Sequence, residues 1–165
     1  MNQLLERLNI LIGRLKLLIL QGNLSTAQGQ KIFETAKSCL GTDASPNDAA
    51  PDELGCADTV SNILIKAGFY MPVIISTAKL FTYLSENAGW MRAGYPLPGD
   101  VIVSPTGTGN GKVPHGHTGI VGSGSTIMSN SSATGTFEPN YTIGGWTNRY
   151  QIKGGYPIYY FRRML

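Results

Sequence analysis

The hydrophobic periodicity of the chain changes near residue 90, and this change constrains the fold more than any other feature. Before it, apolar residues recur every three or four positions, as on one face of an α-helix. After it, short β-branched and aromatic runs stand between glycines and prolines, which is typical of strands. Helices first and strands afterwards predict a single α+β domain, with N-terminal helices packed on a mostly antiparallel sheet.

The helical half is expected to hold helices over 24–41, about 56–68 and 76–87. Ser25 and Gln28 have the spacing of a capping box, and Gly41 ends the first of these helices. Cys39 falls on the apolar face of that helix, so we interpret it as a core thiol. The expected strands are GDVIVSP (99–105), HTGIVG (117–122), STIMSN (125–130) and YPIYYFRR (156–163).

Two loops carry motif-like residues without the spacing of a known site. The glycine-rich segment 105–116 is expected to join two strands as a hairpin loop. It is not a phosphate loop, because Val113 follows Gly111 and Lys112 where serine or threonine is needed. The acidic segment 42–53 lacks the spacing of a calcium loop. We therefore predict no metal and no cofactor.

The first twenty residues, MNQLLERLNILIGRLKLLIL, form the most apolar stretch. Arg7, Arg14 and Lys16 interrupt it, so it predicts neither a membrane span nor a secretory signal. Its leucines alternate spacings of four and three, as in a coiled-coil seam. Three alternatives stay open for this amphipathic helix: packing on its own domain, formation of a homo-oligomer through residues 4–19, or contact with a membrane as an interfacial anchor or weak signal-anchor.

Gly22 is predicted to break the chain after that helix, which separates an N-terminal segment (1–22) from the main domain (24–165). The formal net charge is +3 and no basic block occurs, which argues against a nucleic-acid partner. Two cysteines are too few for a disulfide scaffold in a chain of 165 residues, although a single Cys39–Cys56 bridge stays open.

Cys56 differs from Cys39 because it begins its helix after a loop. A helix N-terminus stabilises a thiolate, so Cys56 is the candidate nucleophile. The base must come from His115 or His117. We favour His117, which opens a strand and is therefore rigidly held, over His115 in the preceding loop.

A third residue is needed to orient the base. Asn130 ends the next expected strand and returns towards His117, so its side chain is the preferred candidate. Ser129, Ser131 and Glu138 are the alternatives. Taken alone, one cysteine and one histidine are more often structural than catalytic.

Three motifs together resemble the CHAP and NlpC-like peptidoglycan hydrolases: LGCADTVSNIL, PLPGDVIVSP and GHTGIVGSGSTIMSNSS. The resemblance runs from about Leu40 to Arg162. It implies a papain-like fold, hydrolysis of amide bonds in bacterial cell walls, and a triad of Cys56, His117 and Asn130. Gly55 departs from both subfamilies, which leaves the subfamily open.

The same resemblance implies that Asp100 is structural and holds a turn near the site, and Asp58 matches an acidic position of some CHAP domains. The small size, with no convincing signal peptide and no recognisable wall-binding repeats, fits a phage-encoded lysin or virion-associated hydrolase. Such a protein is expected to be made in the cytoplasm and to act on the cell wall or periplasm after release, or to be carried in a phage particle. Trp90, Tyr141 and Trp146 are candidates for lining a substrate groove, with core packing as the alternative. Rival functions are another papain-like activity (peptidase, deamidase or acyltransferase) and a non-catalytic phage assembly module.

Overall fold

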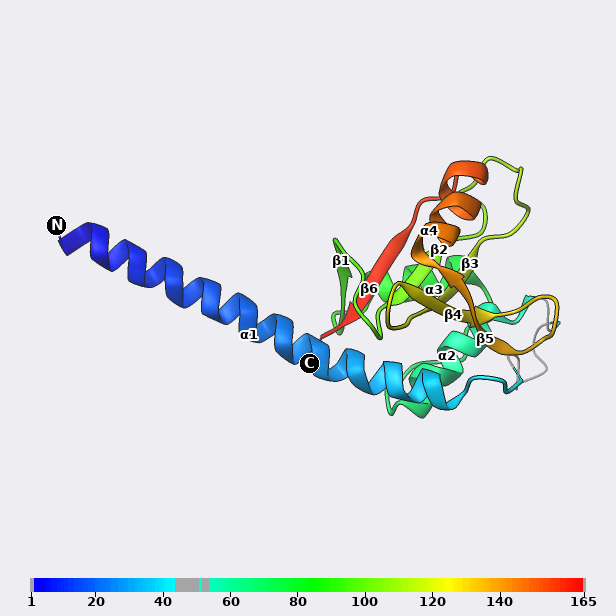
Figure 1. Cartoon of the computed structure of the whole chain (residues 1–165), viewed down its shortest axis with the longest axis horizontal. Coiled ribbons are helices and arrows are strands. Elements are labelled where there is room, and N and C mark those ends of the chain that lie inside the picture. Colours follow the sequence, from blue (N-terminus) through cyan, green and yellow to red (C-terminus); the bar gives the residue numbers. More distant parts are fainter. Residues whose placement is uncertain (1, 44–50, 52–53, 165) are drawn as a thin grey trace.

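The computed structural model describes residues 2–43, 51 and 54–164, with the backbone alone for 2, 3 and 14–26. Its six-stranded antiparallel sheet has the order β1-β6-β2-β3-β4-β5, which confirms the α+β fold (Figure 1). The helices are α1 (Asn2–Ser38), α2 (Cys56–Lys66), α3 (Thr77–Glu86), α4 (Ile143–Trp146) and the π-helix η2 (Thr147–Lys153). The strands are β1 (Trp90–Ala93), β2 (Val101–Ser104), β3 (His117–Val121), β4 (Thr126–Asn130), β5 (Phe137–Thr142) and β6 (Tyr159–Arg163).

Both faces of the sheet are covered. Val101, Val103 and Ile120 pack against α1, α2 and α3 in one core. Ile102 and Val121, which alternate with them along the strands, pack on the other face with residues of α4 and η2. The strands predicted from the sequence at β2, β3, β4 and β6 are confirmed, as is the hairpin loop 105–116 between β2 and β3.

The predicted break at Gly22 is wrong, since α1 continues through it as one helix from Asn2 to Ser38. Ser25 therefore lies inside the helix and cannot be its N-terminal cap. A single glycine lowers helix stability by only about 1 kcal/mol, so it does not by itself end a helix. Further along α1, Gly29 approaches Gly99 so closely that a side chain at Gly99 would overlap the Gly29 backbone.

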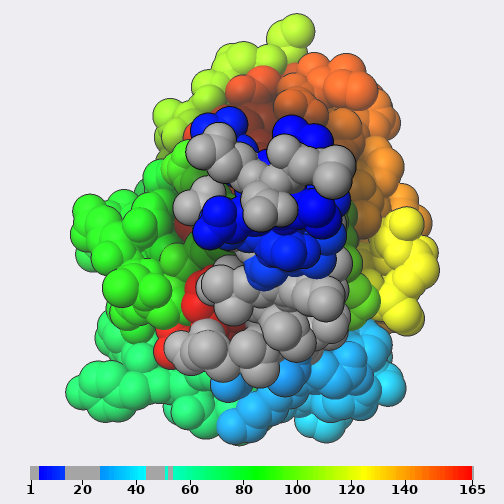
Figure 2. All heavy atoms as spheres, turned by 90° about the vertical axis from the view of Figure 1, so that its left-hand side faces the viewer, coloured from blue at the N-terminus to red at the C-terminus, as the bar shows by residue number. Residues whose placement is uncertain are grey.

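The N-terminal part of α1 projects from the body of the protein (Figure 1), and Figure 2 shows its first described residues in front of the body. Leu4 is 79% exposed and Leu11 is 66% exposed, so for residues 4–13 the structure contradicts packing on the same domain. Oligomerisation and contact with a membrane surface stay predictions. Among the described residues, no helix is long and apolar enough to cross a membrane.

Four elements were absent from the sequence-based prediction: β1, β5, α4 and η2. β1 and β5 are the two edge strands of the sheet. Their sequences, WMRA and FEPNYT, have weak strand character, and Pro139 is tolerated in β5 because an edge strand leaves backbone N–H groups without a ladder partner. Ile143, Trp146 and Tyr150 have the spacing of one helix face. The prediction assigned only strands and loops after residue 90, so this helical signal was missed.

Asp100 has the structural role that the family resemblance implied, but it does not lie near the site. It accepts two hydrogen bonds from Arg162, at 2.8 and 3.0 Å, and one from the backbone of Leu97 at 2.8 Å, which closes the turn before β2. Ser104, at the opposite end of β2, is the residue that pairs with His117. Four residues of strand, about 13 Å, separate Asp100 from that end.

Replacing Arg162 with methionine should lower the free energy of unfolding by about 3–5 kcal/mol, because it leaves the Asp100 carboxylate buried without its counter-charge. Burial already raises the pKa of Asp100, and the Arg162 guanidinium opposes that rise. Without Arg162 the carboxyl pKa rises further in the folded state. Stability of the variant should therefore fall as the pH increases from about 4 towards 7. Urea unfolding at several pH values measures this. The double variant Asp100→Asn/Arg162→Met should recover part of the loss, and a flat pH dependence would contradict the assignment.

Candidate active site

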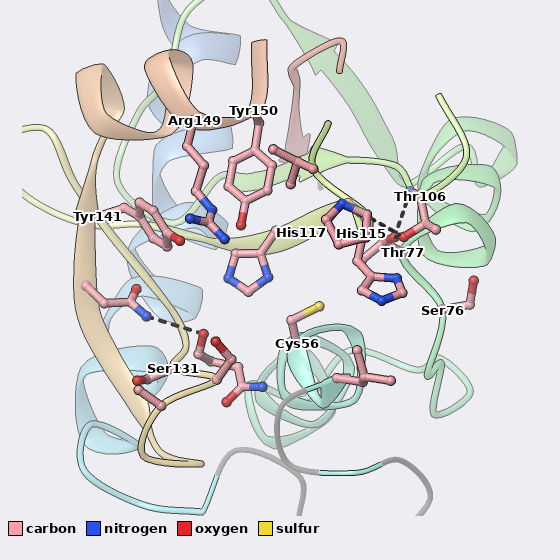
Figure 3. Close-up of a pocket in the computed structure, with 18 of the residues that line it drawn as sticks. Cys56, Ser76, Thr77, Thr106, His115, His117, Ser131, Tyr141, Arg149 and Tyr150 are labelled. Carbon is pink, nitrogen blue, oxygen red and sulfur yellow. Dashed lines mark hydrogen bonds between the residues drawn. The ribbon is translucent and has the colours of Figure 1, made fainter. Parts of the chain in front are cut away.

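A cavity of about 780 Å³ lies where the sheet meets the N-terminus of α2 (Figure 3). Cys56 reaches it from the start of α2, and His117 reaches it from the start of β3. The end of β4, strand β5, the π-helix and the 105–116 loop supply the other walls. Other described residues that line the cavity include His115, Asn130, Ser131, Asn140, Tyr141, Arg149 and Tyr150.

Cys56 is the first residue of α2, and Gly55 stands at the N-cap position. The glycine has no side chain to accept a hydrogen bond from the first turn, so the N–H groups there are not capped by it. In Figure 3 the Cys56 sulfur lies in the cavity between His117 and His115, with its bond directed to the His115 side. The predicted placement of Cys56 at a helix start is thus confirmed.

The expected low pKa of Cys56 is not observed. Burial raises the pKa of its thiol to about 11, and hydrogen bonds from the backbone of Thr118, Ala57 and Cys56 itself oppose that rise only in part. Only 7% of the residue is exposed, so the cost of holding a charge away from water exceeds the gain from the helix N-terminus. Cys56 is therefore a neutral thiol at neutral pH.

His117 is held between the sheet and an aromatic layer, defined here as Tyr141, Trp146 and Tyr150. Its ring stacks on Trp146 at 5.2 Å and on Tyr150 at 5.7 Å between centroids. The Trp146 indole in turn donates a hydrogen bond of 3.1 Å to Ser104, the cross-strand neighbour of His117. This packing fixes the plane of the imidazole.

The same enclosure lowers the pKa of His117 to about 4. Loss of hydration disfavours the imidazolium, and the nearby positive charge of Arg149 disfavours it further. A hydrogen bond to the Asn130 backbone acts in the opposite direction. At neutral pH the imidazole is thus uncharged and can accept a proton.

A chain of hydrogen bonds fixes which ring nitrogen of His117 carries the proton. His117 Nε2 lies 3.0 Å from Ser129 Oγ, which donates to Asn140 Oδ1 at 2.7 Å. The Asn140 amide is oriented by a second bond, from its Nδ2 to the Asn130 carbonyl at 3.3 Å. Because Ser129 gives its only proton to Asn140, it accepts from His117 Nε2–H. His117 Nδ1 is left as the basic nitrogen.

Ser129 and Asn140 thus form the side-chain hydrogen bonds that orient His117, the role that the sequence predicted for Asn130. Asn130 lines the cavity and contributes to the site through its backbone carbonyl, while Ser131 lies beside it on the cavity wall. Glu138 is not among the described residues that line the cavity, and its carboxylate accepts hydrogen bonds from Thr134 and Thr136. A catalytic role for the Asn130 side chain stays a prediction.

Of the three aromatic residues proposed for a substrate groove, only Tyr141 lines the cavity. Trp146 is fully buried behind His117 and positions the ring instead. Trp90 is buried in the helix-side core, where it packs on Phe69 at the far edge of the sheet. Core packing, the alternative expected for these tryptophans, is the correct one.

Sequence reasoning missed Asn140, Arg149 and Tyr150, because their elements β5 and η2 were missed. A π-helix is rare and often occurs at functional sites. Here η2 brings both Arg149 and Tyr150 to the cavity (Figure 3).

Both cysteines are free, which contradicts the alternative of a Cys39–Cys56 bridge. Cys39 belongs to the helix-side core, as predicted. Among the described residues, no group of three or more histidine, cysteine, aspartate or glutamate side chains is placed to hold a metal ion. Most of the acidic segment 42–53, considered above for calcium, lies outside the described residues.

No protein-family model matches the sequence, and no curated protein matches it. The likeness to CHAP and NlpC-like enzymes therefore stays a prediction from the three motifs.

The rate of alkylation of Cys56 should rise with pH in proportion to the fraction of the thiol that is ionised. With a pKa of about 11, the rate of labelling by iodoacetamide is expected to rise about tenfold per pH unit between pH 7 and 9.5. Mass spectrometry of the two cysteine peptides separates Cys56 from Cys39. His117→Ala is the control, since it should leave the rate of the free protein nearly unchanged. A rate that is constant between pH 6 and 8, and that collapses in His117→Ala, would instead indicate a preformed thiolate–imidazolium pair.

Proposed function

We propose that the protein is a cysteine hydrolase that cleaves amide bonds through Cys56 and His117. One observation carries the proposal: both side chains enter the same cavity, and the Ser129–Asn140 chain holds the proton of His117 on Nε2. The free Nδ1 is then available for the thiol proton. An uncharged thiol beside an uncharged, oriented imidazole is a nucleophile–base pair.

In the first half-reaction, the Cys56 sulfur bonds to the amide carbonyl carbon while its proton passes to His117 Nδ1. The carbonyl oxygen becomes an oxyanion, which the Cys56 backbone N–H at the start of α2 stabilises. The carbon–nitrogen bond then breaks, and His117 gives the proton to the leaving amine. The product that stays on the protein is a thioester.

In the second half-reaction, His117 takes a proton from water as the water oxygen bonds to the thioester carbon. The carbon–sulfur bond breaks and the proton returns to the sulfur. The net reaction converts an amide and water to a carboxylic acid and an amine. No cofactor takes part in this scheme.

We propose bacterial peptidoglycan as the substrate, with either a stem-peptide amidase or an endopeptidase activity. The support comes from the motif resemblance, together with an α+β arrangement in which a cysteine-bearing helix packs on an antiparallel sheet whose strand carries the histidine. The mild positive charge of the chain suits an anionic polymer such as a cell wall. A phage lysin or virion-associated hydrolase is the corresponding biological role.

A non-catalytic assembly module is the second candidate, favoured by the exposed apolar residues of α1, such as Leu4 and Leu11. In that role, residues 4–19 join copies of the chain and the cavity is inert. The other papain-like activities (peptidase, deamidase or acyltransferase) use the same pair on a protein substrate. Product analysis by mass spectrometry distinguishes them from wall hydrolysis.

Cys56→Ala and His117→Ala should each lower the rate of clearing of purified cell walls by more than about 10³-fold, because each removes one partner of the proton transfer. Turbidity measures the rate, and the new termini released from defined muropeptides identify the bond cleaved. Circular dichroism confirms that the variants fold. Cys39→Ser is the matched control, since it changes the other cysteine outside the cavity. Walls cleared equally well by Cys56→Ala would refute the proposal.

Ser129→Ala should lower kcat by about 10- to 100-fold, because it removes the acceptor that fixes the His117 tautomer. Asn130→Ala should cost less, since the backbone carbonyl that contacts this chain is retained. Steady-state kinetics on one muropeptide compares the two variants. If Asn130→Ala proves as damaging as Ser129→Ala, the Asn130 side chain is the third catalytic residue that the sequence suggested.

A further inference from the structure

Arg149 is a charged residue of the cavity that the proposed mechanism does not use. It lies on the exposed side of η2 and lines the cavity with Tyr141 and Tyr150. In Figure 3 its guanidinium points between these two rings towards His117. Arg149 and the Cys56 sulfur appear on different sides of the His117 ring in that view.

Tyr150 holds the guanidinium in place. Arg149 makes a side-chain hydrogen bond with Tyr150, and its Cζ lies 5.6 Å from the Tyr150 ring centroid. Tyr150 is itself buried and stacked on His117, so this support is rigid. A guanidinium carries five N–H donors, and one bond to a phenol oxygen leaves most of them free for a ligand.

The described part of the chain supplies Arg149 with no carboxylate. The ion pairs found there join Lys37 to Glu34 and Arg162 to Asp100. The described residues that line the cavity include Arg149 and two histidines but no aspartate or glutamate. A planar guanidinium in such surroundings fits a carboxylate, which it binds through two parallel hydrogen bonds.

The position of Arg149 relative to His117 indicates which part of a substrate it meets. His117 delivers its proton to the leaving amine, so that half of the substrate lies beside the imidazole. Arg149 flanks the imidazole on the side away from the nucleophile in Figure 3. A group bound to Arg149 is therefore carried by the amine component.

We propose that Arg149 binds a free carboxylate on the leaving-amine half of the substrate, which makes it a specificity-determining residue. This inference rests on the proposed hydrolase function for its orientation. The favoured substrates are amides whose amine component is an amino acid. That amino acid keeps a free carboxylate close to the scissile bond, with no other charge between the two. Amides in which that carboxylate is itself amidated are the disfavoured class.

A bound carboxylate also changes the electrostatics of the base. The charge of Arg149 lowers the pKa of His117, and a carboxylate paired with the guanidinium cancels that effect. Proton transfer from Cys56 is then easier when the correct substrate is present than in the free protein. Arg149 thus contributes both to the choice of substrate and to the proton transfer that activates Cys56.

The test uses a synthetic wall stem tetrapeptide with free carboxylates and the same peptide with every carboxylate amidated. Wild-type protein should cleave the free form with a kcat/KM about 10- to 100-fold higher, as expected for a charge-assisted hydrogen-bonded pair. Arg149→Gln should abolish this preference, and Arg149→Lys should restore part of it. Lys153→Gln is the matched control: it removes one positive charge from the same helix but outside the described lining of the cavity, and it should keep the preference.

Calorimetry with Cys56→Ala separates this inference from the hydrolase proposal. Tighter binding of the free form, lost in Cys56→Ala/Arg149→Gln, supports the carboxylate site even if neither peptide is cleaved, and in that case the hydrolase proposal fails alone. Cleavage of both peptides at equal rates, or a preference that survives Arg149→Gln, overturns the Arg149 assignment and leaves the hydrolase proposal standing. No binding of either peptide overturns the Arg149 assignment as well.

A proton NMR titration gives a further readout, since Arg149→Gln should raise the pKa of His117 from about 4.

Discussion

The central strands of the sheet are buried on both faces, because helices α1–α3 cover one side and α4 with η2 covers the other. Every polar group placed at the end of these strands must therefore find a partner inside the protein. The end shared by β2, β3 and β4 meets this requirement with Ser104, His117 and Ser129, each of which has a side-chain partner. The candidate site is the place where this two-sided burial ends and a cavity begins.

Burial accounts for the orientation of the Cys56–His117 pair and for its charge state together. The aromatic layer orients His117 and at the same time removes the water that would stabilise an imidazolium. The helix packing around Cys56 likewise outweighs the favourable N-terminus of α2. In the proposed reaction, proton transfer between the two would create opposite charges in a site of low dielectric, where their attraction would offset part of the cost. The pair thus differs from a preformed thiolate–imidazolium pair in its resting charge.

The sequence was sufficient to predict elements with strong periodicity. The helices at α2 and α3 and the strands β2, β3, β4 and β6 follow from apolar spacing, and Cys56 and His117 follow from their positions at element ends. Edge strand β5 could not be found in this way, because FEPNYT has a proline and polar residues where a buried strand has apolar ones. Asn140 was lost with it. Tyr150 carried a helical signal through its spacing from Ile143 and Trp146, but the π-helix that brings Arg149 to the cavity beside it has a period that matches neither 3.6 nor 2. The low pKa expected for Cys56 failed for another reason: a helix start is visible in a sequence, whereas the degree of burial is not.

Under the proposed function, the neutral resting pair has a chemical advantage. A thiolate reacts with oxidants and alkylating agents far faster than a thiol does, so a nucleophile that ionises only with substrate bound is protected in its absence. Arg149 contributes to this, because its charge opposes the imidazolium until a counter-charge arrives. A carboxylate on the substrate supplies that counter-charge at the moment when proton transfer is needed. Arg149 thus raises the energy of the thiolate–imidazolium pair in the free protein. When the substrate carboxylate pairs with Arg149, that energy falls.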